Sequence, residues 1–469
     1  MNDIPKNTAI EALSANVVDT RFQNFDHVTV ENTKTRIIDL VGCLIGGANA
    51  AGNSALVDLI KEWGGKKEST ILIHGGKVPA HNAAMVNSIM ARSFDFEALC
   101  PLVDGRSNRG THVSATTVLT AITMGEMKNI DGKELISAVL VGDDVASRVL
   151  AASGYGFALG WDCTGTVNMF GATAIAGRLL GLDKLEMKHA FGIVLNQVAG
   201  SLQSIYDGAT AFKLYQGTAA RNGIFSAQLA QAGWTGPEDA LLSKFGYYHL
   251  YTEGCKNPEI LTKDLGKSYY ADATYKPYPC CRGNHPFIDC ALAIVNKHDI
   301  NAEDIEEVTV TAPTKGGLDG FLAQPFRIGE FPHGNAIFNY RYTVATALLR
   351  KGVKPEHFSE EAIRDPKLNA FLDKIRLAGL PGPSDPPRLT EGGVSVKMKD
   401  GREFSEFTDS PKGDPVLNPM TTDEIIAKFR ANVAFSGTIS EKKGEQVLTL
   451  LENLEKLDRV GTMVELLVS

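Results

Sequence analysis

The residues best suited to chemistry are gathered in the stretch from Tyr275 to Pro286, which reads YKPYPCCRGNHP. It places Lys276, Arg282 and His285 within ten residues, and its three prolines restrict the backbone that carries them. A stiff loop holds cations at fixed positions, and a cation already in place binds a small carboxylate without first having to be ordered. The stretch therefore indicates a carboxylate site. The alternative is an ordinary tight turn with two buried thiols and solvated charges.

The same stretch offers thiol and imidazole groups, but the pattern is a poor one for a metal. Cys280, Cys281 and His285 form no CxxC pair, and no second cluster of ligands accompanies them in the sequence. There is no P-loop and no GxSxG nucleophile elbow. Gly156 is followed by three residues before Gly160, where a dinucleotide fingerprint has two. We therefore expect neither a metal ion nor an organic cofactor.

The composition describes an ordinary globular protein. Of 469 residues, 22% are charged and 43% are hydrophobic, and a chain of this length is too long for one compact core. The formal charge of -8 argues against nucleic acid and against an anionic membrane surface as partners, because either would favour a basic face. An acidic protein that binds a small anion must do so in a local basic pocket.

The cysteines and the N-terminus bear on the cellular compartment. Seven cysteines, an odd and scattered set, suit free thiols in a reducing compartment better than a disulfide framework. The N-terminus has no basic region followed by an apolar core, and no run reaches 18 apolar residues. We expect a cytoplasmic protein without a membrane segment.

Helical periodicity dominates the first part of the chain. One helix is predicted at Thr33–Ala48 with Asn32 as its N-cap, and its glycines thin one face, so that we expect a neighbouring helix to approach it closely. Capping patterns predict further helices over residues 131–153 and 183–200. These patterns are typical of a closely packed helical domain.

The pattern changes past residue 266. A strand is predicted at Glu307–Thr311, and a β-hairpin turns at Asp400-Gly401. Helices are predicted between them at Ile337–Leu349 and Glu360–Ile375, and the tail from Thr422 returns to a helical period.

Together these patterns predict a mainly α fold in two domains. A large all-α helical domain is formed by both chain ends, residues 1–266 and 411–469. A smaller α+β domain, residues 267–410, is inserted between them.

Five motifs, in order along the chain, resemble those of one known family. They are Arg36 to Gly47, Ala83 to Asn87 leading to Asp95-Phe-Glu97, Gly142 to Arg148, Lys276 to Cys281 with His285-Pro286, and Pro411 to Pro415 with Asn418-Pro419. With these motifs the chain resembles the MmgE/PrpD family, which includes 2-methylcitrate dehydratases, cis-aconitate decarboxylases and iminodisuccinate epimerases. The resemblance runs from about residue 30 to about residue 430.

The resemblance implies a helical domain built from both chain ends, an inserted α+β lid, and assembly as a homodimer. It also implies an active site in the cleft between the helical domain and the lid, without a metal or organic cofactor. Family members act on di- and tricarboxylates, making or breaking bonds next to a carboxylate. By position, Asp95 matches the aspartate of the family's aspartate-rich turn, and His112 matches the histidine that follows it. Lys276 matches the lid lysine, and Lys213 matches the second lysine.

The chain departs from the family pattern at three positions where many members carry histidine. It has Arg92 ahead of Asp95, Asp162 between Trp161 and Cys163, and Tyr215 before the glycine of the lysine loop. These replacements remove imidazoles that would serve as acid and base partners, so the reaction need not be the commonest one in the family.

A reaction at a carbon α to a carboxylate needs cations that stabilise an enolate-like charge and a base about 3 Å from the proton. Lys276, Lys213 and Arg282 can supply the positive charge. His112 can move the proton, since an unperturbed imidazole has a pKa of about 6.5 and populates both forms near neutrality.

Other residues are further candidates for the site. Asp95 could orient the catalytic histidine or act as a second base, and Asp162 could do either if it lies in the cleft. His285 and Arg109 are candidates for binding a substrate carboxylate, with solvated side chains as the alternative for Arg109. The hydroxyl of Tyr340 could face the site, although packing within the lid explains this residue equally well.

We therefore expect a cofactor-independent lyase that acts on a small di- or tricarboxylate by proton abstraction α to a carboxylate, most simply a dehydration like that of 2-methylcitrate. An epimerase or isomerase of a dicarboxylate comes second. It needs bases on opposite faces of the carbon, for which His112 and either Asp162 or Asp95 are candidates. Decarboxylation of a cis-aconitate-like acid is the third reading, and a catalytically silent, carboxylate-binding dimer is the non-enzyme alternative.

Overall fold

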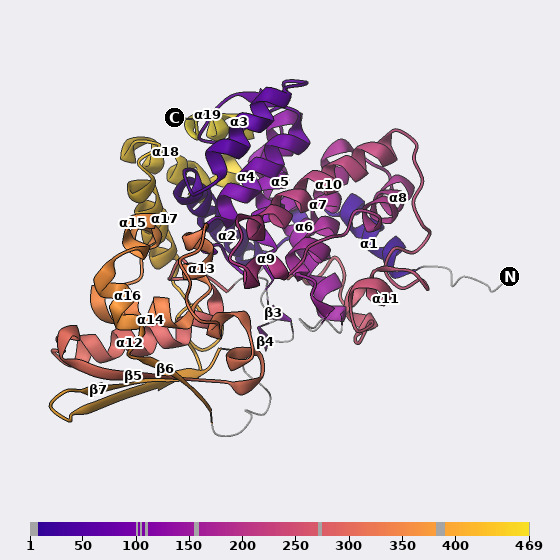
Figure 1. Ribbon diagram of the computed structural model, residues 1–469. Helices are drawn as coiled ribbons and strands as arrows, with labels where there is room; N and C mark the ends of the chain where they lie inside the picture. Colours follow the sequence, from indigo (N-terminus) through magenta and orange to yellow (C-terminus); the bar gives the residue numbers. More distant parts are fainter. Residues whose placement is uncertain are drawn as a thin grey trace.

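The computed structural model describes residues 8–99, 111–153, 159–270, 274–380 and 390–468, together with the backbone of two short strands at 102–103 and 106–107. These residues form a mainly α-helical protein with a small α+β region, which confirms the predicted fold class (Figure 1). Two hydrophobic cores organise the chain, a larger one among helices and a smaller one around a four-stranded sheet. Within the described ranges, no helix combines the length and the apolar run needed to cross a bilayer.

The larger core is formed by helices from both ends of the chain. In Figure 1 the yellow C-terminal helices lie beside the indigo and purple helices of the first hundred residues. The contributing helices are α1 (Ala9–Asp19), α2 (His27–Gly47), α3 (Asn53–Trp63), α4 (Ala80–Arg92), α5 (Ser114–Lys128), α6 (Gly132–Ala152), α7 (Cys163–Leu180), α8 (Lys184–Leu195), α10 (Leu214–Gln231), α11 (Tyr247–Tyr251), α17 (Thr422–Ser436), α18 (Glu441–Glu452) and α19 (Val460–Leu466).

The glycines of α2 explain why the C-terminal helix α17 packs so closely on it. A Cβ added at Gly42 would lie 3.1 Å from the Cα of Phe429, and one added at Gly46 would lie 2.5 Å from the Oδ1 of Asn432. A larger residue at either position would require α17 or its side chains to shift. The close helix contact predicted from the glycines is therefore confirmed.

The smaller core surrounds a sheet with strand order β6-β5-β7-β8. Strands β5 (Ile305–Ala312) and β6 (Ile375–Gly379) are parallel, whereas β7 (Gly392–Met398) and β8 (Glu403–Thr408) join antiparallel. Helices lie over one face of this sheet (Figure 1). The helices of this region are α12 (His285–Lys297), α13 (Pro332–Ile337), α14 (Tyr340–Arg350), α15 (Glu360–Ile363) and α16 (Pro366–Leu372).

Several small elements complete the fold. The short helix α9 lies between α8 and α10 in the chain, and two pairs of two-residue strands are antiparallel. Their bounds are Gln203–Tyr206 for α9, Ser69–Thr70 and Lys77–Val78 for β1 and β2, and Leu102–Val103 and Arg106–Ser107 for β3 and β4.

Two predicted helix boundaries in the first part of the chain are wrong. Helix α2 begins at His27 rather than at Thr33, because the carboxylate of Asp26, and not Asn32, caps it. Helix α8 ends at Leu195 rather than near residue 200. The amides of Asn196 and Gln197 donate to carbonyl oxygens three residues earlier, and these bonds turn the chain.

The segment predicted as one helix at Glu360–Ile375 is instead two helices and the start of a strand. Pro366 lacks an amide hydrogen, so it interrupts the helical ladder and opens α16, with Asp365 as the N-cap. Ile375 begins β6, which pairs in parallel with β5. The predicted hairpin at Asp400-Gly401 is confirmed as the β7–β8 connection.

Arg148 on α6 anchors the chain where it leaves the helical region. Its guanidinium donates to the carboxylate of Asp144 at 2.8 Å. It also donates to the carbonyl oxygens of Ile260, Lys263 and Ser268, each at 2.8 Å. These bonds fix the path of the segment that leads into the smaller core.

A buried cation ties α17 to the turn that follows α4. The Nζ of Lys428 donates to the Oδ1 of Asp39 and to the carbonyl of Phe96, both at 2.7 Å, and it lies 3.8 Å from the ring centroid of Phe96. The other oxygen of Asp39 accepts from the amide of Ala98 at 3.0 Å. The C-terminal helix therefore helps to position the turn that carries Asp95.

We expect Lys428→Met to lower the free energy of unfolding by about 3–5 kcal/mol, because it leaves the carboxylate of Asp39 buried without its cation. The double variant with Asp39→Asn recovers part of this loss. The measurement is urea unfolding followed by circular dichroism. The control is Lys297→Met, which removes an exposed pair with Glu406 and changes the free energy by no more than about 1 kcal/mol. Equal stabilities of the two lysine variants would contradict this reading.

Candidate active site

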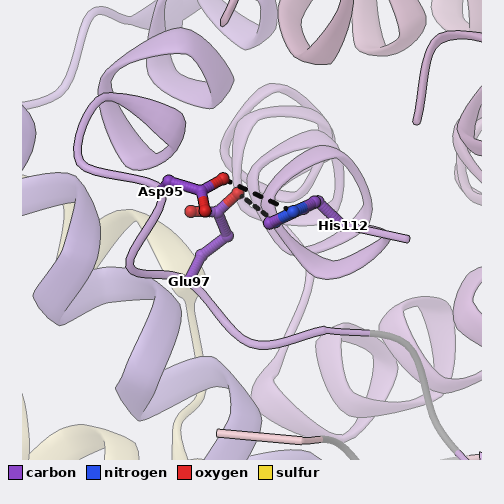
Figure 2. A group of neighbouring side chains, drawn as sticks. All are labelled: Asp95, Glu97 and His112. Carbon is purple, nitrogen blue, oxygen red and sulfur yellow. Dashed lines mark ion pairs between the residues drawn. The ribbon is translucent and has the colours of Figure 1, made fainter. Parts of the chain in front are cut away.

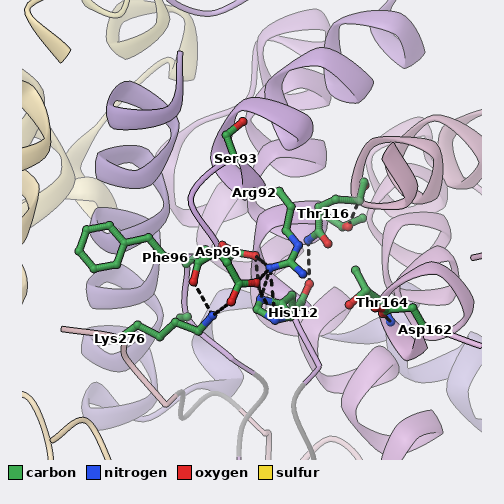
Figure 3. A network of polar contacts seen from close by, with 12 residues as sticks. Arg92, Ser93, Asp95, Phe96, His112, Thr116, Asp162, Thr164 and Lys276 are labelled. Atoms are coloured by element: carbon green, nitrogen blue, oxygen red, sulfur yellow. Dashed lines mark hydrogen bonds and ion pairs between the residues drawn. The ribbon is translucent and has the colours of Figure 1, made fainter. Parts of the chain in front are cut away.

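Five charged or titratable side chains form one buried cluster where the two cores meet. They are Arg92, Asp95, Glu97, His112 and Lys276, and none is more than 7% exposed (Figure 3). The first comes from the last residue of α4, the next two from the turn after it, His112 from the segment before α5, and Lys276 from the loop before α12.

The turn after α4 is shaped to bury a carboxylate. Phe94 and Phe96 both pack into the smaller core, while Asp95 between them has a φ of +50°. Aspartate tolerates this left-handed conformation better than most residues. The amide of Asp95 donates to the carbonyl of Arg92 at 3.0 Å, which closes the turn against the end of the helix. The Asp95 carboxylate bonds instead to Arg92 and Lys276.

The guanidinium of Arg92 is the central cation of the cluster. Its Nη1 donates to the Oδ1 of Asp95 and, at 3.0 Å, to the Oε1 of Glu97. The same nitrogen lies 3.1 Å and 3.3 Å from the two ring nitrogens of His112. One side chain therefore contacts both acids and the imidazole.

Lys276 brings the loop of the smaller core to the same carboxylate. Its Nζ donates to the Oδ2 of Asp95 at 2.7 Å and also to the main-chain oxygen of that residue. Burial lowers the pKa of Lys276 to about 8, an effect that the charge of Glu97 opposes and that of Arg92 adds to. The structure thus places Lys276, Asp95 and His112 around one point, although their predicted roles stay predictions.

His112 is held by its ring and by its backbone. Its Nδ1 lies 2.7 Å from the Oε1 of Glu97, and its Nε2 lies 3.4 Å from the Oδ1 of Asp95 (Figure 2). Its carbonyl oxygen accepts hydrogen bonds at 2.7 Å from the side-chain amides of Asn168 on α7 and Gln216 on α10. These four contacts leave the imidazole little freedom to rotate or shift.

The electrostatic environment keeps this imidazole neutral. Burial, followed by the charges of Arg92 and Lys276, lowers the pKa of His112 to about 3. Burial would raise the pKa of Glu97, but the charge of Arg92 and the bond from His112 hold it well below its usual range. Because the ionised Glu97 can only accept, the Nδ1 of the neutral His112 carries the hydrogen. Its Nε2 is left with a lone pair, as a general base requires.

Asp95, Glu97 and His112 could in principle hold a metal ion, since their ligand atoms lie within 4.8 Å of one another. The Nη1 of Arg92 contacts all three of these groups and takes the place of a cation among them. A divalent ion would also face Lys276 on Asp95. These three groups therefore suit the guanidinium of Arg92 better than a metal ion.

Asp162 lies close to the cluster without bonding to it through any contact among the described residues. Its Oδ1 accepts from the amide of Thr164 at 2.7 Å, which makes it the N-cap of α7. In the view of Figure 3 it stands on the side of His112 away from Lys276. Its proposed role as a base stays a prediction.

Lys213 is a buried cation with neutral partners only, as far as the described residues show. Its Nζ donates to the carbonyl of Ala51 and to the Oδ1 of Asn53, both at 2.7 Å, and to the Oγ of Ser93 at 3.3 Å. Burial lowers its pKa to about 7. Ser93 follows Arg92 directly, so Lys213 borders the cluster without being part of it.

Arg282 and His285 bond within the loop and its surroundings. Arg282 donates to the carbonyls of Pro411, at 3.0 Å, and Lys412, and its Nη1 lies 3.1 Å from the Nδ1 of His285. The Nε2 of His285 lies 3.3 Å from the carbonyl of Cys280. These contacts brace the loop that carries Lys276, and a role in substrate binding for either residue stays a prediction.

The remaining two candidates are placed differently. Tyr340 is buried and packs edge-on against Phe287 with ring centroids 4.8 Å apart, which fits the packing alternative. Arg109 lies outside the described residues.

Sequence reasoning missed Glu97 as a site residue and treated Arg92 only as a departure from a family pattern. The alternation Asp-Phe-Glu at 95–97 was the available signal, since side chains two residues apart share a side of an extended segment. No pattern in the sequence indicated that Arg92 would contact both acids.

We expect the imidazole of His112 to stay neutral from pH 5 to pH 8, because this range lies above its pKa in the folded protein. Arg92→Gln removes the cation that contacts both ring nitrogens, so it raises the pKa of His112. NMR of the protein with labelled histidine measures the titration, with the signal assigned by its absence in His112→Asn. Arg430→Gln, which alters a surface pair with Glu445, is the control. A titration midpoint of His112 between pH 5 and pH 8 in the unmodified chain would contradict this prediction.

Comparisons with known proteins place this site in a family context. Residues 11–259 match the MmgE/PrpD N-terminal domain, and residues 278–455 match the MmgE/PrpD C-terminal domain. The cis-aconitate decarboxylase of Homo sapiens is 25% identical over 455 residues, which cover 93% of this chain and 90% of that relative. The enzyme of the same name from Mus musculus is 24% identical over 94% of this chain and 90% of its own length. That of Aspergillus terreus is 24% identical over 93% of this chain and 91% of its own. With both of its domains matched in order, the chain belongs to the MmgE/PrpD family.

Proposed function

We propose that this protein is a lyase that acts on a small di- or tricarboxylate, and that it decarboxylates a cis-aconitate-type acid. The relatives support this reaction class, since proteins named cis-aconitate decarboxylase align with 93% of the chain or more. The observation that carries the proposal is the contact of Lys276 with Asp95 beside His112. This contact brings the ammonium of Lys276, from the loop of the smaller core, next to the neutral imidazole of His112 in the helical region.

Three helices begin around His112 and favour an anion there. His112 itself precedes α5, and Thr111 contacts Cys163, the first residue of α7, at 2.9 Å. Gln216 in the first turn of α10 donates to the carbonyl of His112. The amide ends of helices attract carboxylates, and Lys276 and Lys213 add positive charge on either side of the turn after α4.

A bound substrate changes the protonation of this site. Each carboxylate of the substrate opposes the effect of Arg92 and Lys276, so it raises the pKa of His112 from its low value. The proposed reaction requires that the imidazole hold a proton while the substrate is bound and release it afterwards. This reversal suits a residue that must take up a proton and deliver it in one cycle.

In decarboxylation, the bond between a substrate carbon and its carboxylate breaks, and carbon dioxide leaves. The electron pair stays on the carbon and spreads onto a neighbouring carboxylate, where Lys276 and Arg92 stabilise the charge. Protonated His112 then delivers its proton to the carbon.

Dehydration of a 2-methylcitrate-like acid is the second candidate, and one observation favours it. The Nε2 of His112 carries a lone pair at neutral pH, which allows it to remove a proton α to a carboxylate before hydroxide leaves. This route needs no prior protonation of the imidazole.

The substrate must enter by movement of the loop before α12. Asp95, Glu97 and Lys276 are fully buried, so a substrate carboxylate reaches Lys276 only when this loop withdraws from Asp95. We propose that residues 267–410 move as a lid on the helical domain formed by residues 1–266 and 411–469. Assembly as a homodimer and a cytoplasmic location stay predictions.

A panel of acids separates the candidate reactions. Purified protein in the presence of a chelator is incubated with cis-aconitate, citrate and 2-methylcitrate, and the products are followed by proton NMR and carbon dioxide release. Loss of carbon dioxide from cis-aconitate supports decarboxylation, and a new alkene from a hydroxy acid supports dehydration. Deuterium uptake without net conversion indicates an epimerase. If no acid reacts or exchanges, the proposal fails and a carboxylate-binding role replaces it.

We expect Lys276→Ala to lower kcat/KM at least about 100-fold with the accepted acid, because a cation that stabilises the developing charge is lost. The matched control is Lys297→Ala, a lysine on α12 in the same region whose partner Glu406 is at the surface. Circular dichroism verifies that both variants are folded. Retention of half of the wild-type activity in Lys276→Ala would remove the loop from the mechanism.

A further inference from the structure

Tyr215 is a buried residue whose hydroxyl has no assigned task in the fold. It is the second residue of α10 and is 5% exposed. Its Oη is buried and makes no hydrogen bond of ordinary geometry among the described residues, and the carboxylate of Asp162 and the guanidinium of Arg92 lie near enough to act on it. A buried hydroxyl without a partner is unfavourable, and native proteins rarely keep one without a reason.

The first turn of α10 is fixed relative to the cluster, and Tyr215 with it. The next residue, Gln216, donates from its side chain to the carbonyl of His112 at 2.7 Å, and its own carbonyl accepts from the Oγ1 of Thr116 at 3.0 Å. Two residues earlier, Lys213 donates to Ser93, which follows Arg92. Tyr215 therefore stands between two points that are bonded to the segments carrying the cluster.

The hydroxyl of Tyr215 lies close enough to Asp162 and Arg92 for their charges to act on it. Burial raises the pKa of its hydroxyl well above the usual value, and the carboxylate of Asp162 raises it further, while the guanidinium of Arg92 opposes both. The hydroxyl thus keeps its hydrogen at every physiological pH and remains a donor.

Other polar atoms around the cluster are also buried without a hydrogen-bond partner in the described part of the chain. They are the Nε of Arg92, the Oε2 of Glu97, the Oγ1 of Thr164, the Oδ1 of Asn168 and the Oε1 of Gln216. A polar ligand beside the cluster would satisfy such donors and acceptors. Ordered water is the alternative occupant.

We propose that Tyr215 is a substrate-binding residue, whose O–H donates a hydrogen bond to a carboxylate oxygen of the di- or tricarboxylate next to Arg92. The inference rests on the proposed function and deepens it. The contact holds the substrate on the side of the site that Asp162 borders.

Binding of a non-reactive acid tests the contact without any chemistry. Propane-1,2,3-tricarboxylate is titrated by calorimetry into the unmodified chain, Tyr215→Phe and Tyr248→Phe. Tyr248 is a buried tyrosine whose hydroxyl donates to the carbonyl of Val149 at 2.9 Å. We expect Kd to rise about tenfold in Tyr215→Phe and to stay unchanged in Tyr248→Phe. An unchanged Kd in Tyr215→Phe, or no binding to the unmodified chain, would overturn the proposal.

Thermal unfolding of the same proteins without ligand separates a binding role from a structural one. Tyr248→Phe loses a hydrogen bond, so its Tm falls. Tyr215→Phe loses no hydrogen bond of ordinary geometry, so its Tm falls less than that of Tyr248→Phe. A fall in Tyr215→Phe as large as that in Tyr248→Phe would assign the hydroxyl a partner within the fold and contradict the proposal.

Turnover distinguishes this inference from the proposed function. If the unmodified chain binds the tricarboxylate more tightly than Tyr215→Phe but converts no acid, the contact stands and the lyase proposal fails. If it converts cis-aconitate and Tyr215→Phe matches it in both KM and Kd, the lyase proposal stands and the contact is refuted.

Discussion

The structure depends on a balance of buried charge where its two cores meet. Arg92 and Lys276 carry two positive charges, and Asp95 and Glu97 carry two negative ones, with His112 neutral among them. A buried ion left without its partner is unfavourable by several kcal/mol, so each member requires the others. This requirement aligns the end of α4, the segment before α5 and the loop before α12. The rest of the fold holds these three pieces in place.

The same balance gives the cluster its chemistry. Burial, and after it the two cations, lower the pKa of His112, so its imidazole is neutral at physiological pH. In the function proposed above, an anionic ligand opposes the effect of the two cations by its own charge. Helix α17 contributes from a distance, because Lys428 bonds to the Phe96 backbone in the turn that carries Asp95 and Glu97. The packing of α17 on the glycines of α2 is therefore part of the site's construction.

Much of the fold followed from local patterns in the sequence, and the errors have local physical causes. The glycine face of α2, the hairpin at Asp400-Gly401 and the mainly α class were correctly predicted, since periodicity and turn chemistry act over a few residues. The helix predicted at Glu360–Ile375 failed because a proline and a parallel pairing with β5 overrode its periodicity. For the site, motifs indicated Asp95, His112 and Lys276, which the structure brings together. The contact of Arg92 with His112 and the surroundings of the Tyr215 hydroxyl depend on segments that are separated in sequence, so they could not be inferred.

A structure of the protein with propane-1,2,3-tricarboxylate bound tests the central claim most directly. The account predicts that one carboxylate of the ligand replaces Asp95 as the partner of the Lys276 Nζ, with the ligand's carbon chain beside the Nε2 of His112. A ligand bound on another surface, with the Lys276–Asp95 pair intact, would contradict it.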